Sequence, residues 1–208
     1  MSVKHPIISV TGSSGAGTST VKHTFQQIFR RESVSAATIE GDAFHRYDRS
    51  SMKKELEKRS GQGDLTFSHF SYDANLLNEL ERCFIDYSES GKCKYRHYVH
   101  NEDEALEYGA TPGTFTDWKE FNERSDLLFY EGLHGAVVNE EVNLAKHADL
   151  KIGVVPVINL EWIQKIHRDR DSRGYSTEAV TDTILRRMHA YVHCVCPQFT
   201  ETDINFQR

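Results

Sequence analysis

The segment from residue 6 to residue 31 constrains the fold of this chain more than any other part of the sequence. Residues 6–11 read Pro-Ile-Ile-Ser-Val-Thr, an apolar, β-branched run typical of a buried parallel strand. Apolar residues at helical spacing follow over residues 21–31. The glycines between them let several backbone N–H groups converge on an anion at a helix N-terminus. This order predicts a phosphate-binding loop made of Gly12, Ser13, Ser14, Gly15, Ala16, Gly17, Thr18, Ser19 and Thr20.

The loop departs from the usual pattern at one position. Thr18 stands where G-x-x-x-x-G-K-[ST] loops carry lysine, while Ser19 keeps the hydroxyl that such loops offer to magnesium. An ordinary glycine-rich turn is the alternative, and a dinucleotide fingerprint has a different glycine order. The strand before the loop and the helix after it favour phosphate binding, so the missing positive charge must come from elsewhere in the chain.

Composition limits the class of protein and of partner. The chain has 208 residues, of which 38% are hydrophobic and 27% charged, as expected for one globular domain over residues 1–208. Its formal net charge of −6 provides no general attraction for nucleic acid or an anionic membrane, so we expect a small-molecule substrate held by a local cluster of cations. The absence of a long apolar run and of a signal-peptide core predicts a cytoplasmic protein, and four unevenly spaced cysteines predict reduced thiols.

The strand-like segments alternate with helical ones, which predicts an α/β sandwich with a mostly parallel sheet. The predicted strands are residues 7–11, 36–40, 94–99, 127–131 and 150–157, and the helical patterns include residues 75–87 and 160–170. Residues 61–72 and 100–122 show little periodicity and are predicted to be loops near a site. Residues 204–208 alternate like the start of a strand with nothing after it to pair.

Two carboxylates follow predicted strands, at the edge where open α/β sheets bind ligands. Glu131 ends an apolar strand next to a glycine, the place of a magnesium-directed acid in phosphate-loop enzymes. Asp42 lies just past residues 36–40 and could take a hydroxyl proton, or merely cap a helix. If the chain turns helical there, three groups that could hold a sugar phosphate share one face, namely His45, Arg49 and Lys53.

Residues 159–174 have the pattern of a charged helix that closes over a site. With Asn159 as N-cap, an apolar stripe is predicted on one side, formed by Leu160, Ile163 and Ile166. Lys165, Arg168 and Asp169 cluster on nearly the opposite, exposed side, and Arg173-Gly174 ends the segment with a possible hinge. Phosphoryl transfer needs positive charge near the moving group, so Lys165 is our candidate to replace the loop lysine.

Together these segments resemble the bacterial (class I) phosphoribulokinases of the phosphoribulokinase/uridine kinase family, over essentially the whole chain. The resemblance rests on Gly12-Ser-Ser-Gly-Ala-Gly-Thr-Ser-Thr20, Glu40-Gly-Asp-Ala-Phe-His-Arg46, Phe67-Ser-His-Phe-Ser-Tyr72, Tyr130-Glu-Gly-Leu-His-Gly135 and Trp162-Ile-Gln-Lys-Ile-His-Arg-Asp169. It implies a P-loop kinase three-layer sandwich, with a mostly parallel central sheet flanked by helices and an adenylate-kinase-like lid.

The resemblance also implies an activity, the ATP-dependent and magnesium-dependent phosphorylation of D-ribulose 5-phosphate at its C1 hydroxyl in Calvin-cycle carbon fixation. Carried onto matching positions, Asp42 resembles the general base, Lys165 the phosphate-stabilising cation and Asp169 a second catalytic acid. Ser19 and Glu131 would face the metal. The residues expected to hold the sugar phosphate are His45, Arg49, Lys53, Arg168 and Arg173.

The resemblance further implies a homo-oligomer activated by NADH and inhibited by AMP. Family members continue with further strands and a helix beyond the position of Arg208, and those elements serve assembly and effector response. Two alternatives stay open at this point. One is a uridine-kinase-like nucleoside kinase, which shares the R-D-x-x-x-R-G segment, and the other is a truncated, non-catalytic nucleotide-binding protein.

Overall fold

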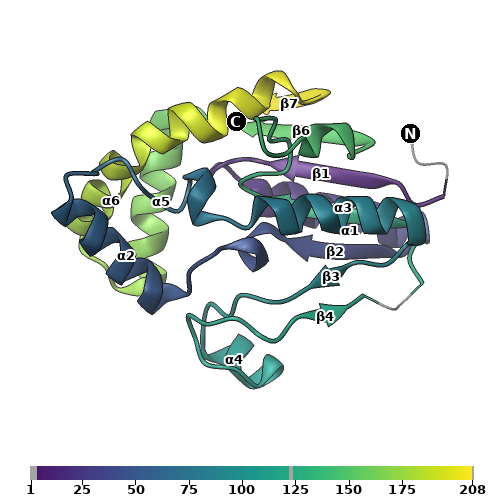
Figure 1. Ribbon diagram of the computed structural model, residues 1–208, viewed down its shortest axis with the longest axis horizontal. Coiled ribbons are helices and arrows are strands. Elements are labelled where there is room, and N and C mark those ends of the chain that lie inside the picture. The colour runs from purple at the N-terminus through teal and green to yellow at the C-terminus, as the bar shows by residue number, and fades with distance from the viewer. Residues whose placement is uncertain (1–3, 122–123, 208) are drawn as a thin grey trace.

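A computed structural model describes residues 4–121 and 124–207, with backbone alone for residues 172–173. Its main sheet has five strands in the order β2-β5-β1-β6-β7, and every pairing is parallel (Figure 1). The strands are β1 (Ile7–Thr11), β2 (Ala36–Glu40), β5 (Leu127–Gly132), β6 (Leu150–Val155) and β7 (Ile204–Gln207). Because all strands point the same way, their carboxyl ends meet at one edge, where the predicted functional segments begin.

Helices cover both faces of this sheet, which confirms the predicted three-layer α/β sandwich. Figure 1 shows α3 (Leu77–Ser90) in front of the strands and α1 (Thr18–Arg31) behind them. Alternate residues along β5 point to opposite faces, so Tyr130 packs edge-on against Phe84 of α3 while Phe129 packs against Phe29 of α1. Each face thus has its own buried aromatic cluster, and the central strands are apolar on both sides.

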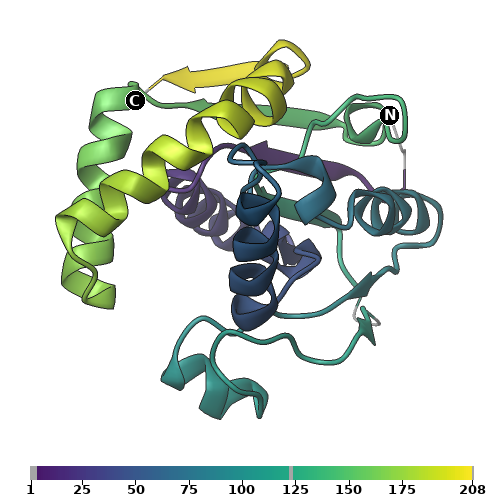
Figure 2. The same cartoon turned by 60° about the vertical axis from the view of Figure 1, so that its left-hand side comes forward.

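The remaining elements surround the carboxyl edge. Helices α5 (Ile158–Arg173) and α6 (Thr177–Ala190) pack against each other beyond the sheet (Figure 2). The other elements are η1 (Gly41–Phe44), α2 (Arg49–Gly61), η2 (Tyr72–Ala74), β3 (Lys94–Tyr95), α4 (Glu102–Tyr108), β4 (Lys119–Glu120), η3 (Leu144–Lys146), η4 (Tyr191–Val195) and η5 (Cys196–Thr200). Within the described part of the chain, no helix is both long and apolar enough to cross a membrane.

Several predicted boundaries were wrong. Residues 94–99 do not join the main sheet, because only β3 is a strand and it pairs antiparallel with β4 in a separate ribbon. The predicted loop over residues 100–122 contains α4, which begins where the Asn101 side chain accepts the Glu104 N–H and ends at Gly109 with a positive φ. Strand β6 stops at Val155 because Pro156 has no N–H to donate.

The C-terminal segment does form a strand, and it has a partner. Residues Ile204–Gln207 pair in parallel with β6, in the register Ile152 to Ile204. The expectation of a strand was therefore right. Its pairing partner is β6, which precedes it in the sequence. Residue 122, the end of one predicted loop, and residue 208 lie outside the described residues.

Candidate active site

Residues 12–20 form a loop between β1 and α1, as the sequence predicts. Gly15 and Gly17 have φ angles of +110° and +102°, a backbone conformation that side chains with a Cβ rarely adopt. Gly12 donates its N–H to the carbonyl of Gly132 at 3.1 Å, which ties the loop to the end of β5. A Cβ at Gly12 would lie 2.9 Å from the Val154 carbonyl oxygen, so the close path of the loop also depends on glycine there. The geometry suits backbone N–H groups that bind phosphate.

Thr18, which replaces the usual lysine, contacts the acid at the end of β5. It is buried at the start of α1, and its hydroxyl is near enough to the Glu131 carboxylate to lower the pKa of that acid. Burial raises the pKa of Glu131, and the contacts with Thr18 and Lys22 oppose that rise. Ser19, the predicted metal ligand, is exposed in the next position of the helix. The structure therefore brings Glu131 to the loop, beside Thr18.

Lys22 is a cation at this edge that the sequence analysis missed. It lies one helical turn after Thr18 and forms an ion pair with Glu40, the last residue of β2. Side chains on a helix lean toward its N-terminus, so the Lys22 ammonium lies over the first turn, beside the acids. The signal that could have found it was the spacing of four residues from the position of the missing lysine.

Asp42 is held against β5 by two glycines in contact. A Cβ on Gly41 would lie 2.8 Å from the Gly132 Cα, and a Cβ on Gly132 would lie 2.6 Å from the Gly41 Cα. This close approach sets η1 directly on the end of β5 and puts Asp42 near enough to Glu131 for their charges to interact. The two predicted carboxylates therefore belong to one site, as their positions after parallel strands required.

Two histidines flank the Asp42 carboxylate. The His45 Nε2 lies 3.2 Å from Asp42 Oδ1 and the His100 Nε2 lies 3.5 Å from Oδ2. Burial alone would raise the pKa of Asp42, but the interaction with these histidines, His45 foremost, outweighs it and holds the pKa well below its usual range. The Asp42 side chain still keeps 40% of its surface exposed, so a substrate hydroxyl can reach it. His100 was missed because its segment was predicted only as a loop.

The proposed helical row of His45, Arg49 and Lys53 is wrong. His45 has an extended backbone after η1, and α2 begins only at Arg49, because the Asp48 side chain caps that helix by accepting the Ser51 N–H at 2.6 Å. Arg49 and Lys53 do share a face of α2, one turn apart. Arg49 donates to the carbonyl of His100 at 3.0 Å, which keeps it beside the Asp42 cluster, and Lys53 is exposed.

Helix α5 lies on the phosphate loop with its charged side inward, which reverses the predicted orientation. Leu160 and Ile163 of the predicted buried stripe are 47% and 50% exposed, whereas Lys165 and Asp169 are 6% and 5% exposed. Nor is Asn159 the N-cap, since α5 begins at Ile158. The prediction assumed that apolar residues face the protein, but this helix packs on a polar loop, so its polar groups find their partners there.

The contacts between α5 and the loop are specific. Ser13 donates to the Glu161 carboxylate at 2.7 Å, and Arg168 donates to the Ser14 hydroxyl at 3.1 Å. Gly15 lets α5 approach, because a Cβ there would lie 3.3 Å from the Glu161 Cγ. The helix predicted to close over the site therefore already touches the loop.

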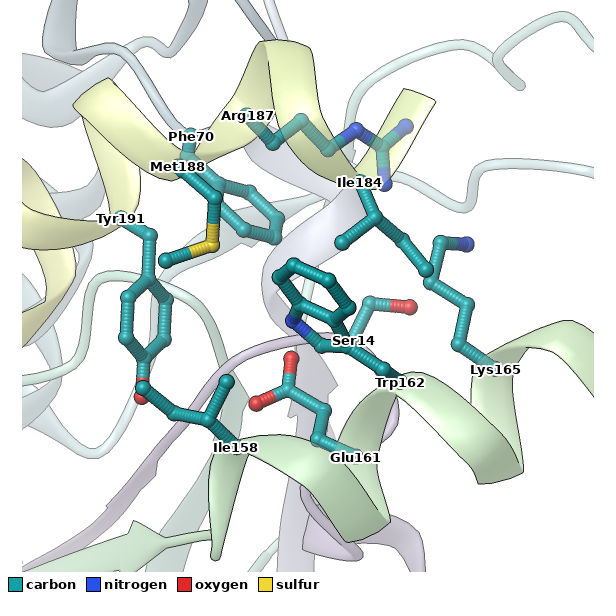
Figure 3. A pocket seen from close by; sticks show the side chains of 10 residues that line it. All are labelled: Ser14, Phe70, Ile158, Glu161, Trp162, Lys165, Ile184, Arg187, Met188 and Tyr191. Atoms are coloured by element: carbon teal, nitrogen blue, oxygen red, sulfur yellow. The ribbon is translucent and has the colours of Figure 1, made fainter. Parts of the chain in front are cut away.

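Lys165 lies in a pocket between the loop, α5 and α6 (Figure 3). Its Nζ donates to Asp169 Oδ2 at 2.5 Å, and Arg168 donates to the other oxygen of that carboxylate at 3.1 Å. Burial lowers the pKa of Lys165 to about 8, with a further lowering by Arg187 that Asp169 opposes. Arg187 of α6, a second cation of this pocket, was not singled out from the sequence. The side chain of Arg173 lies outside the described residues.

Comparison with known proteins identifies the family of the chain. The family model for "Phosphoribulokinase / Uridine kinase family" matches residues 7–208. Phosphoribulokinase 1 of Cereibacter sphaeroides is 73% identical over 208 residues, which are 100% of this chain and 72% of that protein. Phosphoribulokinase of Nitrobacter vulgaris is 66% identical over 205 residues, covering 99% of this chain and 71% of that protein.

Solved structures show the same relationship. The phosphoribulokinase from Rhodobacter spheroides has a TM-score of 0.86 and 70% identity, and the match covers 98% of this chain and 70% of that one. A possible uridine kinase from Bacillus stearothermophilus shares the fold alone, with a TM-score of 0.59 and 15% identity over 98% of this chain and 89% of that one. The chain belongs to the phosphoribulokinase/uridine kinase family.

Proposed function

We propose that this chain is a kinase that transfers the γ-phosphoryl group of ATP to the C1 hydroxyl of D-ribulose 5-phosphate. The products are ribulose 1,5-bisphosphate and ADP, and the reaction belongs to Calvin-cycle carbon fixation. Relatives named phosphoribulokinase at 58–73% identity along the whole chain support this activity. The observation that carries it is the meeting, at one sheet edge, of the phosphate loop, the Asp42 carboxylate between two histidines, and a helix bearing Lys165.

In this proposal Asp42 acts as general base. Its depressed pKa keeps it ionised at neutral pH, and its exposed face can accept the C1 hydroxyl proton as that oxygen attacks the γ-phosphorus. The bond to the oxygen bridging the β-phosphate breaks as the new bond forms, and the proton passes to Asp42 and from there to solvent. A base at this position contributes about 10²- to 10⁴-fold to the rate.

Lys165 is proposed to stabilise the negative charge of the moving phosphoryl group, in place of the absent loop lysine. Its side chain passes the loop at Gly15, where a Cβ would lie 3.6 Å from the Lys165 Cβ. Asp169 would orient this ammonium through their hydrogen bond, and Arg168 would add a second positive charge beside Ser14. Catalysis by positioned cations is what phosphoryl transfer requires, because charge spreads over the transferred group.

The loop and the acids also fit magnesium. Residues 12–20 are proposed to hold the ATP phosphates, with Ser19 and Glu131 toward the metal, and hydroxyl and carboxylate oxygens are the ligands that Mg²⁺ prefers. When bound, the ion would neutralise charge on the phosphate oxygens. The sugar phosphate would be held by His45, Arg49, Lys53, Arg168 and Arg173.

Three further features remain proposals that rest on family resemblance. They are assembly into a homo-oligomer, activation by NADH with inhibition by AMP, and a cytoplasmic location. Native mass spectrometry tests the first, and turnover measured with and without each nucleotide tests the second.

The activity is tested by incubating the chain with MgATP and ribulose 5-phosphate and identifying the bisphosphate by mass spectrometry. Direct detection of product is preferable to a coupled assay that consumes NADH, since NADH is itself a proposed activator. Uridine serves as the competing acceptor. Phosphorylation of uridine alone would support the nucleoside kinase alternative, which has no acceptor phosphate for Arg49 to hold. ATP binding without turnover of either acceptor would favour a non-catalytic nucleotide-binding protein.

A further inference from the structure

Asn75 links the proposed base to a buried hydrogen-bond network. The residue is 4% exposed and directly follows η2. Its backbone forms an isolated antiparallel β-bridge with His45. Its amide Nδ2 lies 2.9 Å from the carbonyl oxygen of His69 and 2.8 Å from that of Ser71. Carbonyl oxygens only accept hydrogen bonds, so these two contacts identify the amide nitrogen. The Asn75 oxygen must therefore face the other way, toward His45.

The position of this oxygen fixes one proton of the His45 ring. His45 Nδ1 lies 2.8 Å from Asn75 Oδ1, and because an amide oxygen only accepts, Nδ1 carries a proton. The other ring nitrogen, Nε2, lies 3.2 Å from Asp42 Oδ1. A neutral ring protonated at Nδ1 would turn the Nε2 lone pair toward the carboxylate, which is repulsive. An attractive contact needs a proton on Nε2 as well, since Asp42 is ionised at neutral pH.

The surroundings of His45 bear on its charge in both directions. The titratable and charged groups that face this cluster are Asp42, His69, Arg96, Tyr98, His100, His134 and Arg187. Burial alone would lower the pKa of His45, and Arg187 acts in the same direction, but Asp42 and Asn75 outweigh them and raise it. Burial also lowers the pKa of His69 to about 3, so this neighbour, whose ring centroid lies 5.8 Å from that of His45, is neutral.

We propose that Asn75 is a positioning residue that holds His45 as an imidazolium against Asp42. The imidazolium keeps Asp42 ionised although the carboxylate of Glu131 lies near enough for their charges to interact. It also fixes Oδ1, so that Oδ2, which lies 3.5 Å from His100 Nε2, is the oxygen left to take the substrate proton. His45 thus acts on the base itself. Because both ring N–H groups are engaged, its proposed part in holding the sugar phosphate would come from its positive charge and not from a hydrogen bond.

The inference has a direct consequence for pH dependence. The imidazolium exists below the pKa of His45 and is lost as the pH rises through that value. At a pH above the pKa of His45, the Nε2 lone pair faces the Asp42 carboxylate, and the contact between His45 and Asp42 is lost. Loss of the Asn75 oxygen removes a hydrogen bond to the charged form, so the same transition should move to lower pH by about one unit.

The test is a histidine titration of the full chain labelled with ¹⁵N-histidine, with the His45 signals identified from their loss in His45→Gln. We expect both ring nitrogens of His45 to be protonated at neutral pH and the ring to titrate above the usual histidine range. In Asn75→Leu the titration should fall by about one unit. A His45 ring that is neutral at neutral pH in the unsubstituted chain would overturn the proposal, and so would an unchanged titration in a folded Asn75→Leu variant.

Gln198→Leu is the matched control. Gln198 is also a buried amide, 1% exposed, and it contacts the Leu133 carbonyl and His134. It does not contact His45, and it reaches Asn75 only through His134, whose Nε2 lies 3.1 Å from Asn75 Nδ2. This variant should lower thermal stability while leaving the His45 titration in place. If Asn75→Leu does not fold, the titration of the unsubstituted chain still decides whether His45 is an imidazolium.

The kinetic readout rests on the proposed function. The basic limb of kcat/KM for ribulose 5-phosphate should move to lower pH in Asn75→Leu, with KM for ATP unchanged. A chain that never phosphorylates ribulose 5-phosphate would refute the proposed function, whereas the histidine titration would still judge the pairing of His45 with Asp42.

Discussion

Lys165 and Asp169 form a buried ion pair across one turn of α5, with Nζ 2.5 Å from Oδ2 and both side chains 7% exposed. Such a pair is sensitive to the loss of either partner, because the remaining charge would stay buried without compensation. The pairing also aims the ammonium, since a carboxylate shared with Arg168 cannot turn freely. The geometry places a fixed cation next to a loop that lacks one.

We expect Lys165→Met to lower kcat by at least about 10²-fold while ATP binding is largely kept, because the charge acts on the moving phosphoryl group. Steady-state kinetics and ATP titration measure the two effects. In the unsubstituted chain, kcat should fall as the pH rises through about 8, where Lys165 loses its proton. In Lys165→Arg this fall of kcat near pH 8 should disappear, because arginine keeps its proton there. The control is Lys54→Met, an exposed lysine of α2. Normal turnover in Lys165→Met would show that another cation replaces the loop lysine.

Asp42→Asn should lose most of kcat, by about 10²- to 10⁴-fold, with both substrates still bound, because a general base acts in the transition state. Since its pKa is depressed, Asp42 stays ionised down to acid pH, and its protonation should not set the acid limb of kcat near neutral pH. Rapid-quench measurement of a single turnover isolates the chemical step. A near-normal rate of that step would remove Asp42 from the role of base.

Arg49→Ala should raise KM for the sugar phosphate by about 10-fold, the value of one charge-assisted contact, with a smaller change in kcat. Arg49 sits at the start of α2 and is held beside His100 by its hydrogen bond. Arg31→Ala, which alters an exposed arginine at the end of α1, is the comparison variant. Equal KM values in the two variants would argue against a substrate contact at Arg49.

Gly132→Ala should both destabilise the fold and lower activity. The added Cβ would lie 2.6 Å from the Gly41 Cα, so η1 must move away from β5 and carry Asp42 with it. Overpacking of this kind costs about 1–3 kcal/mol. Thermal unfolding and kcat measure the two consequences. Gly61→Ala is the control, because a Cβ there meets nothing within 4 Å at the end of α2. Equal stability of the two variants would contradict the close packing of η1 on β5.

Lys22→Met should weaken activation by magnesium. Burial raises the pKa of Glu131, and the positive charge of Lys22 partly opposes that rise. Removing Lys22 should therefore raise the pKa of Glu131 further and leave a smaller fraction of it ionised. The magnesium concentration for half-maximal activity should rise, and more at acid than at alkaline pH, because protonation of Glu131 competes with the metal. Lys22→Arg should retain most of the unsubstituted behaviour. If the magnesium requirement is the same in Lys22→Met and the unsubstituted chain, Lys22 does not influence the metal site.

The central strands and the positions of Asp42 and Glu131 could be predicted from the sequence, because buried parallel strands are long apolar runs and ligands bind where they end. The orientation of α5 could not, since hydropathy treats Leu160 and Ile163 as inward-facing and takes no account of a polar loop as packing partner. The pairing of His45 with Asn75 was equally hidden. It depends on how two segments thirty residues apart come together, and neither segment shows a pattern that reveals the other.

The hydrogen bonds from α5 to Ser13 and Ser14 have a consequence for the reaction cycle. Because the helix holds both loop serines, the shape of the loop follows the position of the helix. A shift of α5 away from the sheet would withdraw Lys165 and loosen the loop at the same moment. If α5 moves in this way, the same helix would both present the Lys165 charge to the phosphoryl group and release the spent nucleotide.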